Sequence, residues 1–178
     1  MRMINAMIPF IALVLSVLSI YLQYGDPSDE VLAAVLGLKD DKTTLSASIA
    51  LINAGQRPAV VHSIQVMWAE QRSNCKQPLH LTEVGKQGGA DGLPALLKPE
   101  HMSVVSLRAS FPEELQKRGD EDYRMCFKFA SLDSAGKRFS PISSVAEVRY
   151  EQAGTHGRVE VMKRNDKTID LLESDTAY

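Results

Sequence analysis

The sequence is poor in cysteine, in aromatic residues and in net charge, and each shortage excludes a class of protein. Two cysteines among 178 residues are too few for a disulfide-framework miniprotein or a four-thiolate zinc site. Twenty Lys+Arg against 22 Asp+Glu give a formal net charge of -2, so no cationic field attracts phosphate backbones and no nucleic-acid partner is expected. The length fits one domain, and 44% hydrophobic residues exclude a disordered chain.

Recognisable catalytic and metal-binding motifs are also missing. The sequence has no Gly-x-Ser-x-Gly elbow, no Ser-x-x-Lys motif and no phosphate-binding glycine loop. His62 lies on the apolar face of its stretch, which favours a buried, hydrogen-bonded core residue over a ligand. His80 and His101 could meet Glu83 or Glu100 across neighbouring strands, but no short ligand pair indicates it. We therefore predict no catalytic residue, no metal and no cofactor.

The longest apolar run stands at the start of the chain, where no charged residue lies between Arg2 and Asp26. A helix over this run would be about 30 Å long, which is the hydrocarbon thickness of a bilayer. The run predicts a transmembrane anchor over residues 1–25 with the bilayer as its partner. The side chains predicted to face the membrane are Ile4, Ile8, Phe10, Leu13, Leu15, Leu18, Tyr21 and Tyr24.

A cleaved signal peptide is the alternative interpretation of this run, because it shares the basic start and the apolar stretch. The residues from Ile20 to Gly25 lack the Ala-x-Ala pattern of a cleavage site, which favours a retained anchor. The positive-inside rule places Arg2 in the cytoplasm and everything after Gly25 outside. The prediction is a single-pass protein of the bacterial inner membrane with a cytoplasmic N-terminus and a periplasmic C-terminal domain.

Cys75 and Cys126 are an even pair, far apart in the sequence. In an oxidising compartment such a pair is more often a disulfide than two free thiols, so a bridge is expected. Cys126 falls on the polar face of the stretch from Tyr123 to Ala130. The bridge is therefore predicted to fasten a loop over the outside of a sheet.

After a connector at residues 26–30, short apolar stretches alternate with period two and are separated by turn residues. From Thr44 to Asn53 the odd positions share an apolar face, and from Val60 to Trp68 the even positions do. Seven to nine such stretches predict an antiparallel β-sandwich over residues 31–164.

The sequence leaves few stretches for secondary structure other than strands. Helix is compatible only with the stretch from Val31 to Leu38 and the surroundings of Pro112 to Arg118. Residues 165–178 read as an acidic C-terminal tail that is loose or forms one short helical turn.

The order of the predicted strands and the turns between them is informative. A strand ending in Asn-Ala-Gly-Gln-Arg-Pro at 53–58 is followed by a long strand, a Leu-Lys-Pro-Glu lead-in at 97–100 and a Tyr-x-Met-Cys-Phe strand at 123–127. This succession resembles the immunoglobulin-like or fibronectin-like modules that bacteria carry behind a single membrane anchor. Trp68 precedes both cysteines, so the Cys-Trp-Cys order of true immunoglobulin domains is absent. The resemblance implies a binding or scaffolding role.

The expected fold is thus an N-terminal transmembrane helix followed by an immunoglobulin-like antiparallel β-sandwich. The turn with Asn53, Gln56, Arg57 and Pro58 stands at a sandwich end, where it either contacts a partner or only reverses the chain. The expected function is that of a membrane-anchored extracytoplasmic interaction or accessory module, a small subunit of a larger complex with other membrane or periplasmic subunits. The alternative is an anchored enzyme or a metal- or ligand-binding protein that uses the exported domain.

Overall fold

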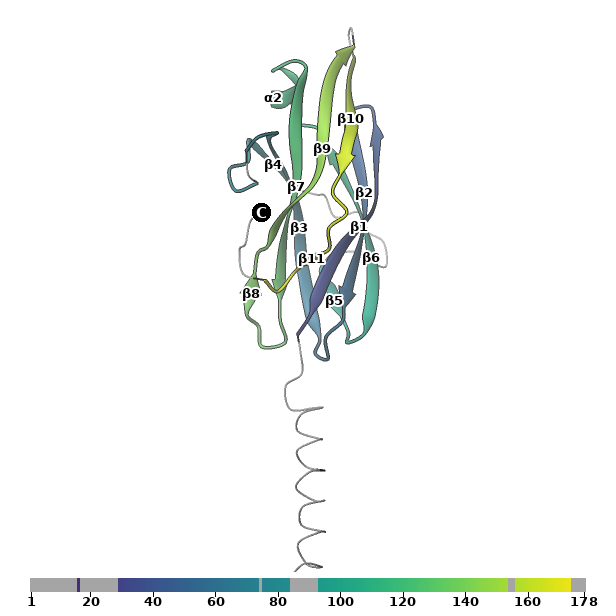
Figure 1. Cartoon of the computed structure of the whole chain (residues 1–178), viewed down its shortest axis with the longest axis vertical. Helices are drawn as coiled ribbons and strands as arrows, with labels where there is room; N and C mark the ends of the chain where they lie inside the picture. Colours follow the sequence, from purple (N-terminus) through teal and green to yellow (C-terminus); the bar gives the residue numbers. More distant parts are fainter. Residues whose placement is uncertain (1–15, 17–28, 74, 84–92, 154–155, 174–178) are drawn as a thin grey trace, which may run out of the picture.

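The computed structural model describes residues 16, 29–73, 75–83, 93–153 and 156–173 (Figure 1). The predicted anchor over residues 1–25 and most of the predicted connector therefore lie outside the described residues, apart from Ser16. Within the described ranges, the structure has no helix with the length and hydrophobicity needed to cross a bilayer.

Two antiparallel sheets make up the described domain, which confirms the predicted mainly-β class (Figure 1). Sheet A has the strand order β11-β1-β2-β6, where β1 is Val31–Asp41, β2 is Thr44–Asn53, β6 is His101–Ser110 and β11 is Ile169–Asp170. Sheet B has the order β10-β9-β7-β3-β4, with β5 beside β3 and β8 beside β7. Its strands are β3 Ala59–Glu70, β4 His80–Glu83, β5 Ala95–Leu97, β7 Glu121–Leu132, β8 Arg138–Phe139, β9 Ile142–Ala153 and β10 His156–Arg164.

The core between the sheets contains a cluster of four aromatic rings. The Phe111 ring stacks on Tyr150 with centroids 5.1 Å apart and meets the edges of Trp68 and Tyr123 at 5.0 and 5.3 Å. Such aromatic pairs are worth about 0.5–1.5 kcal/mol each beyond the area that they bury. Trp68 is fully buried, so the apolar face of even positions that ends at Trp68 faces the core at that residue.

A short helix covers one end of this aromatic cluster. Helix α2, Glu113–Gln116, begins directly after Pro112 and buries Leu115, so it lies in one of the two stretches where the sequence permits helix. The Tyr123 hydroxyl donates a hydrogen bond to the Glu121 carboxylate at 2.9 Å. Burial, together with this carboxylate, raises the pKa of the Tyr123 hydroxyl.

A β-bulge in β3 corrects the predicted face of that strand. The register against β7 shifts between Val61 and Ser63, so the strand gains one residue relative to its partner. Val61 faces the core before the bulge and Ile64 after it, which turns His62 outward. The prediction of a buried core histidine at position 62 is therefore wrong, because the alternation changes phase at the bulge.

Both ends of the described domain belong to the sheets. The stretch from Val31 to Leu38, where the sequence also permits helix, is strand, since it pairs with β2 on both sides of a bulge at Leu36. The sequence after residue 164 is not a loose tail throughout, because β11 pairs with β1 and Leu171 is buried. The Leu171 N–H donates to the Val31 carbonyl at 2.7 Å, so the apolar alternation of Ile169 and Leu171 outweighs the acidic neighbours.

Candidate interaction surface

The outer face of sheet A is apolar in the half where the chain enters β1. Strand register sets Leu32, Ile52 and Met102 side by side in one row and Ala34, Ala50 and Val104 in the next. Leu36, at the bulge of β1, adjoins these rows. We define the apolar face as the outward side chains of these three strands in this half: Leu32, Ala34, Leu36, Ala50, Ile52, Met102 and Val104.

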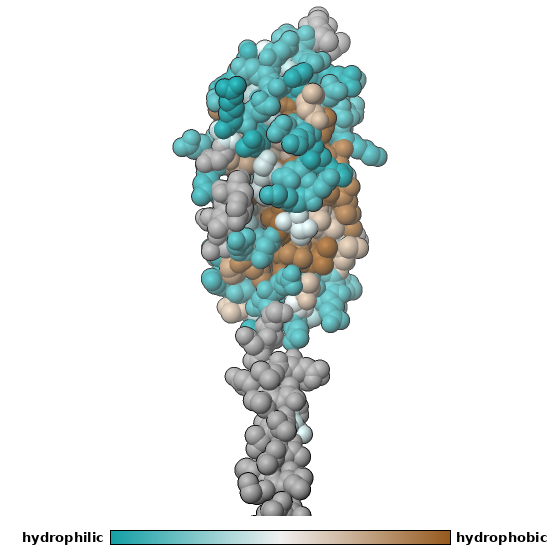
Figure 2. Space-filling view, in the orientation of Figure 1, coloured by the Kyte–Doolittle hydropathy of each residue, from teal (hydrophilic) through white to brown (hydrophobic). Residues whose placement is uncertain are grey.

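Three side chains of the apolar face are exposed to solvent. Met102 is 60% exposed, Leu36 54% and Val104 39%. Figure 2 shows hydrophobic surface over the lower half of the domain, where Figure 1 places β1 and β6. Contiguous exposed apolar surface marks interaction sites more often than isolated apolar residues do.

The same sheet becomes polar toward its other end, so the apolar face has a defined limit. The row after Val104 holds Ser48 and Ser106, and the next row holds Lys39, Ser46 and Arg108. No charged side chain lies among the outward residues of β1, β2 and β6 in the first two rows, whereas Asp170 of β11 borders Leu32. The face therefore combines an uncharged centre with a polar rim, the usual anatomy of a protein interface.

The turn predicted to contact a partner has a largely structural role. Asn53 is buried; its side-chain amide donates to the carbonyls of Arg57 at 2.8 Å and Leu97 at 3.0 Å, and its Oδ1 accepts from the Gly55 N–H at 3.0 Å. Asn53 therefore offers no contact surface, which corrects its place among the predicted partner residues. The physical reason is that a polar side chain at a strand end satisfies the backbone groups of its own turn.

The rest of that turn is exposed and closes on the start of β1. The N–H groups of Ala54 and Gly55 donate to the Glu30 carbonyl at 2.9 and 3.1 Å, and the Arg57 guanidinium lies 3.9 Å from the Asp29 carboxylate. The predicted partner contacts Gln56, Arg57 and Pro58 are exposed. Their partner-binding role stays a prediction.

The Cys75–Cys126 disulfide is present, as predicted. Both sulfurs are buried in a small cluster with Met67, against which Ile142 packs, and this cluster is separate from the main core. The bridge therefore fastens the segment after β3 over the outer face of sheet B, also as predicted. The Arg124 guanidinium adds a second tie, since it donates to the Ser73 carbonyl at 2.9 Å.

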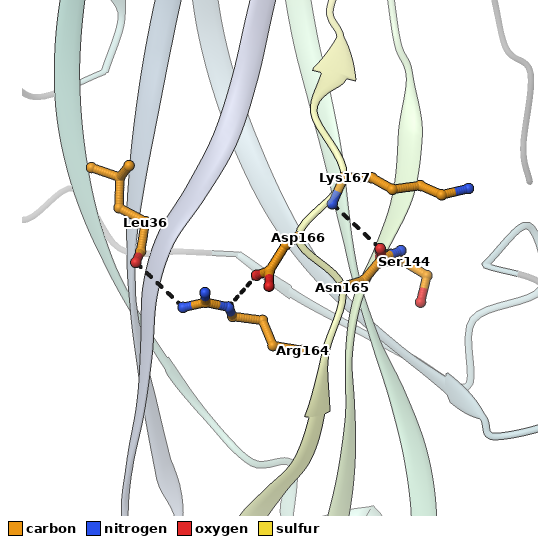
Figure 3. Close-up of polar contacts among 6 residues, drawn as sticks. All are labelled: Leu36, Ser144, Arg164, Asn165, Asp166 and Lys167. Atoms are coloured by element: carbon orange, nitrogen blue, oxygen red, sulfur yellow. Dashed lines mark hydrogen bonds and ion pairs between the residues drawn. The ribbon is translucent and has the colours of Figure 1, made fainter.

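A groove of about 450 Å³ lies on the outer side of sheet B, beside the segment that crosses from β10 to β11. This segment is held on both sides: Arg164 donates to the Leu36 carbonyl at 3.3 Å and pairs with Asp166, and the Asn165 amide donates to the Ser144 carbonyl at 3.0 Å (Figure 3). The groove lining contains charges of both signs, among them Arg124, Glu147, Lys163, Lys167 and Asp170.

The histidines with described side chains do not meet. His80 on β4 lies 3.5 Å from the Glu114 carboxylate, whereas His101 is exposed on β6 in the other sheet and faces Asn53 at the opposite end. His80 and His101 do not come together, because the crossover between β4 and β6 places them on different sheets. Within the described ranges, no three His, Cys, Asp or Glu side chains are grouped to hold a metal ion.

Comparisons with known proteins give structural likenesses only. No family model and no curated protein matches the sequence. Among solved structures, the chain is similar to the putative ApaA protein from Bordetella pertussis, with 16% identity and a TM-score of 0.37 over 73% of this chain and 96% of that one. A structural-genomics target, SoR45, has 17% identity and a TM-score of 0.34 over 74% and 90% of the two chains.

The β-glucosidase from Kluyveromyces marxianus has 15% identity and a TM-score of 0.35, and the match covers 81% of this chain and 14% of the enzyme. At these scores, none of the three likenesses bears on the function of this chain. The assignment of a two-sheet antiparallel sandwich rests on the strand pairing described above.

Proposed function

We propose that the chain is a membrane-anchored accessory subunit whose exported, immunoglobulin-like β-sandwich holds a partner protein against the apolar face of sheet A. The observation that carries the proposal is the uncharged pair of rows that ends in the exposed side chains of Met102 and Val104. Burying a Met or Val side chain fully is worth about 1.5–3 kcal/mol, so a face with several such groups supplies the affinity of a specific contact. The proposal needs no catalytic group and no cofactor.

Position along the chain supports a partner in or near the membrane. The proposed anchor over residues 1–25 faces lipid with Ile4, Phe10, Leu18 and the side chains named with them above, and it ends shortly before β1. The five connector residues, 26–30, reach at most about 18 Å when extended. The apolar face begins at Leu32, so this topology holds it close to the periplasmic surface of the bilayer, within reach of another membrane subunit.

The disulfide supports the exported location of the domain. Protein disulfides persist in oxidising compartments such as the bacterial periplasm and are rare in the reducing cytosol. A buried Cys75–Cys126 bridge therefore agrees with a periplasmic domain behind a cytoplasmic N-terminus.

The test is a comparison of three full-length, affinity-tagged chains extracted from their own membranes in mild detergent. One is the wild type, one carries Met102→Glu with Val104→Glu, and the control carries Gln77→Glu with Ser134→Glu. The control adds the same two charges at exposed positions in the β3–β4 and β7–β8 connections of sheet B, away from the apolar face and from β6.

We expect a stoichiometric companion protein with the wild type and the control, and an at least tenfold loss of it with Met102→Glu/Val104→Glu. All three chains should melt at similar temperatures, because the substituted positions are exposed. An unchanged companion set in all three chains, or no companion with any of them, contradicts the proposal.

A further inference from the structure

Strand β6 has an unusual edge. Among the described residues, β6 pairs with β2 alone, and its ten residues keep an unbroken register from Ser110 opposite Thr44 to His101 opposite Asn53. The strand contains no proline, and Arg108 is its only Lys, Arg, Asp or Glu residue. Natural sheets usually blunt such edges with short strands, bulges, prolines or charges, because an open edge is a template for another strand.

The other described edge strands show these protective features. Strands β4, β5, β8 and β11 have between two and four residues each. Strand β10 is longer, but it has a register shift between Val161 and Lys163, and its Val159 N–H donates to the Lys42 carbonyl of the β1–β2 turn at 2.7 Å. Strand β6 is therefore the long, flat edge of the described domain.

The direction of the free backbone groups on β6 follows from one hydrogen bond. The Phe111 N–H donates to the Thr43 carbonyl at 2.7 Å, directly beyond the Thr44–Ser110 pair. In an antiparallel ladder, successive residues direct their N–H and C=O groups to opposite sides. The odd residues of β6 therefore face β2, and the even residues point their backbone groups away from it.

These outward backbone groups adjoin the apolar face. The even residues include Met102 and Val104, whose side chains lie on the outer face, so one set of residues offers both free N–H and C=O groups and apolar contacts. No residue in the described ranges forms a hydrogen bond with the outward backbone groups between Met102 and Ser110. An added strand would find a complete ladder and a hydrophobic surface together.

We propose that β6 receives an extended segment of the partner protein by β-strand addition, which extends sheet A by one strand. The inference rests on the proposed function, because the partner subunit supplies the segment. Beside Met102 and Val104 the segment is uncharged and has apolar side chains on the shared face. At its other end it carries a carboxylate beside Arg108.

The distribution of charge on sheet A determines which side chains the added segment can carry. The rows that contain Met102 and Val104 hold no charge on β1, β2 or β6, so a charged side chain there would lose hydration without gaining a counter-ion. Arg108 is 55% exposed and its nearest carboxylate, Asp41, is 3.8 Å away and itself 71% exposed. Such an open pair leaves guanidinium donors for a second carboxylate.

A second copy of this chain fits the edge less well. Symmetric pairing of β6 with itself is antiparallel, so it would point the two starts of β1 in opposite directions. Residues 1–28 precede β1 at the His101 end of the strand, where Asn53 and the Glu30 carbonyl also lie. Two anchored chains in one membrane cannot adopt that arrangement, and parallel pairing of copies does not close.

The test uses the full chain in detergent micelles and a fluorescein-labelled nonapeptide in which valine alternates with threonine and one end carries glutamate. Two forms, with glutamate at the first or the last position, distinguish parallel from antiparallel addition. The variant Ser106→Pro removes an N–H that points away from β2, a change that an edge strand tolerates. The control Ser106→Ala removes the hydroxyl and keeps the N–H.

We expect saturable peptide binding that Ser106→Pro weakens at least tenfold and Ser106→Ala less than twofold. In the wild type, bound peptide should slow hydrogen exchange at least tenfold at the amides of Val104 and Ser106, and leave the already bonded amides of Ser103 and Val105 unchanged. The exchange measurement keeps the inference falsifiable even where the proline variant fails to fold.

Absent peptide binding, equal weakening by the two Ser106 variants, or unslowed exchange at Val104 and Ser106 overturns strand addition. The proposed function is judged separately, by whether Met102→Glu/Val104→Glu loses the native companion. A dimer of the peptide-free chain with protected Val104 and Ser106 amides would assign the edge to a second copy and also overturn the inference.

Discussion

Replacing Asn53 by alanine should destabilise the domain without touching a partner contact. The Asn53 side chain is 1% exposed and makes three hydrogen bonds, to the carbonyls of Arg57 and Leu97 and from the Gly55 N–H. The substitution removes all three and leaves the buried Leu97 carbonyl without the Asn53 donor. The turn between β2 and β3 then loses the group that ties it to β5.

The expected loss is about 2–4 kcal/mol. Each net hydrogen bond contributes about 0.5–1.5 kcal/mol, and an orphaned buried acceptor costs about 1–3 kcal/mol. For a domain of this size, one kcal/mol corresponds to about 2–4 °C in Tm, so the melting temperature should fall by about 4–16 °C. Asn53→Asp should be at least as damaging, because a carboxylate cannot donate to the two carbonyls.

The assay is urea unfolding followed by circular dichroism, together with a thermal melt. Gln56→Ala is the matched control, since Gln56 is exposed in the same turn. The control should change the free energy of unfolding by less than about 0.5 kcal/mol. The reasoning is refuted by an Asn53→Ala variant as stable as the control, or by a fully stable variant that loses the native companion.

Two further predictions concern the bridge and an ion pair. Changing Cys75 and Cys126 together to alanine removes the bridge across a sequence separation of 51 and should lower the free energy of unfolding by about 4 kcal/mol. Full thiol labelling of the wild type without reductant would contradict the presence of the bridge. The hydrogen bond from Arg149 lowers the pKa of the Asp122 carboxyl. The Arg149–Asp122 pair therefore stabilises the fold at pH values above the unfolded Asp pKa of about 3.9. This stabilisation is lost as the pH falls through the lower pKa of Asp122 in the folded state. Arg149→Met should raise the Asp122 pKa in an NMR titration, and an unchanged value would refute the assignment.

Features that depend only on the residues of a single strand could be predicted from the sequence. The alternation of Tyr123, Met125 and Phe127 against Cys126 placed three side chains in the core and the cysteine on the outer face, and the structure confirms both. A period of two fixes the face of every residue as long as the strand has no irregularity. The short helix after Pro112 follows from equally local chemistry, since proline suits a helix start.

Features that depend on register between strands could not be predicted. The bulge at Val61 and Ser63 depends on pairing with β7, so His62 was assigned to the wrong side. The apolar face needs Leu32, Ile52 and Met102 in one row, although they come from three distant segments. Apolar residues out of phase with the core alternation in all three segments were the available signal.

Site-specific photo-cross-linking in intact cells can determine whether a partner protein lies on the apolar face. A benzoylphenylalanine placed at position 102 of the full chain lies on the apolar face, and one placed at the exposed position 151 lies on β9 of sheet B. We predict one discrete protein adduct from position 102 and none from position 151. Lipid adducts alone, adducts with another copy of this chain, or the same adduct from both positions would contradict the proposal.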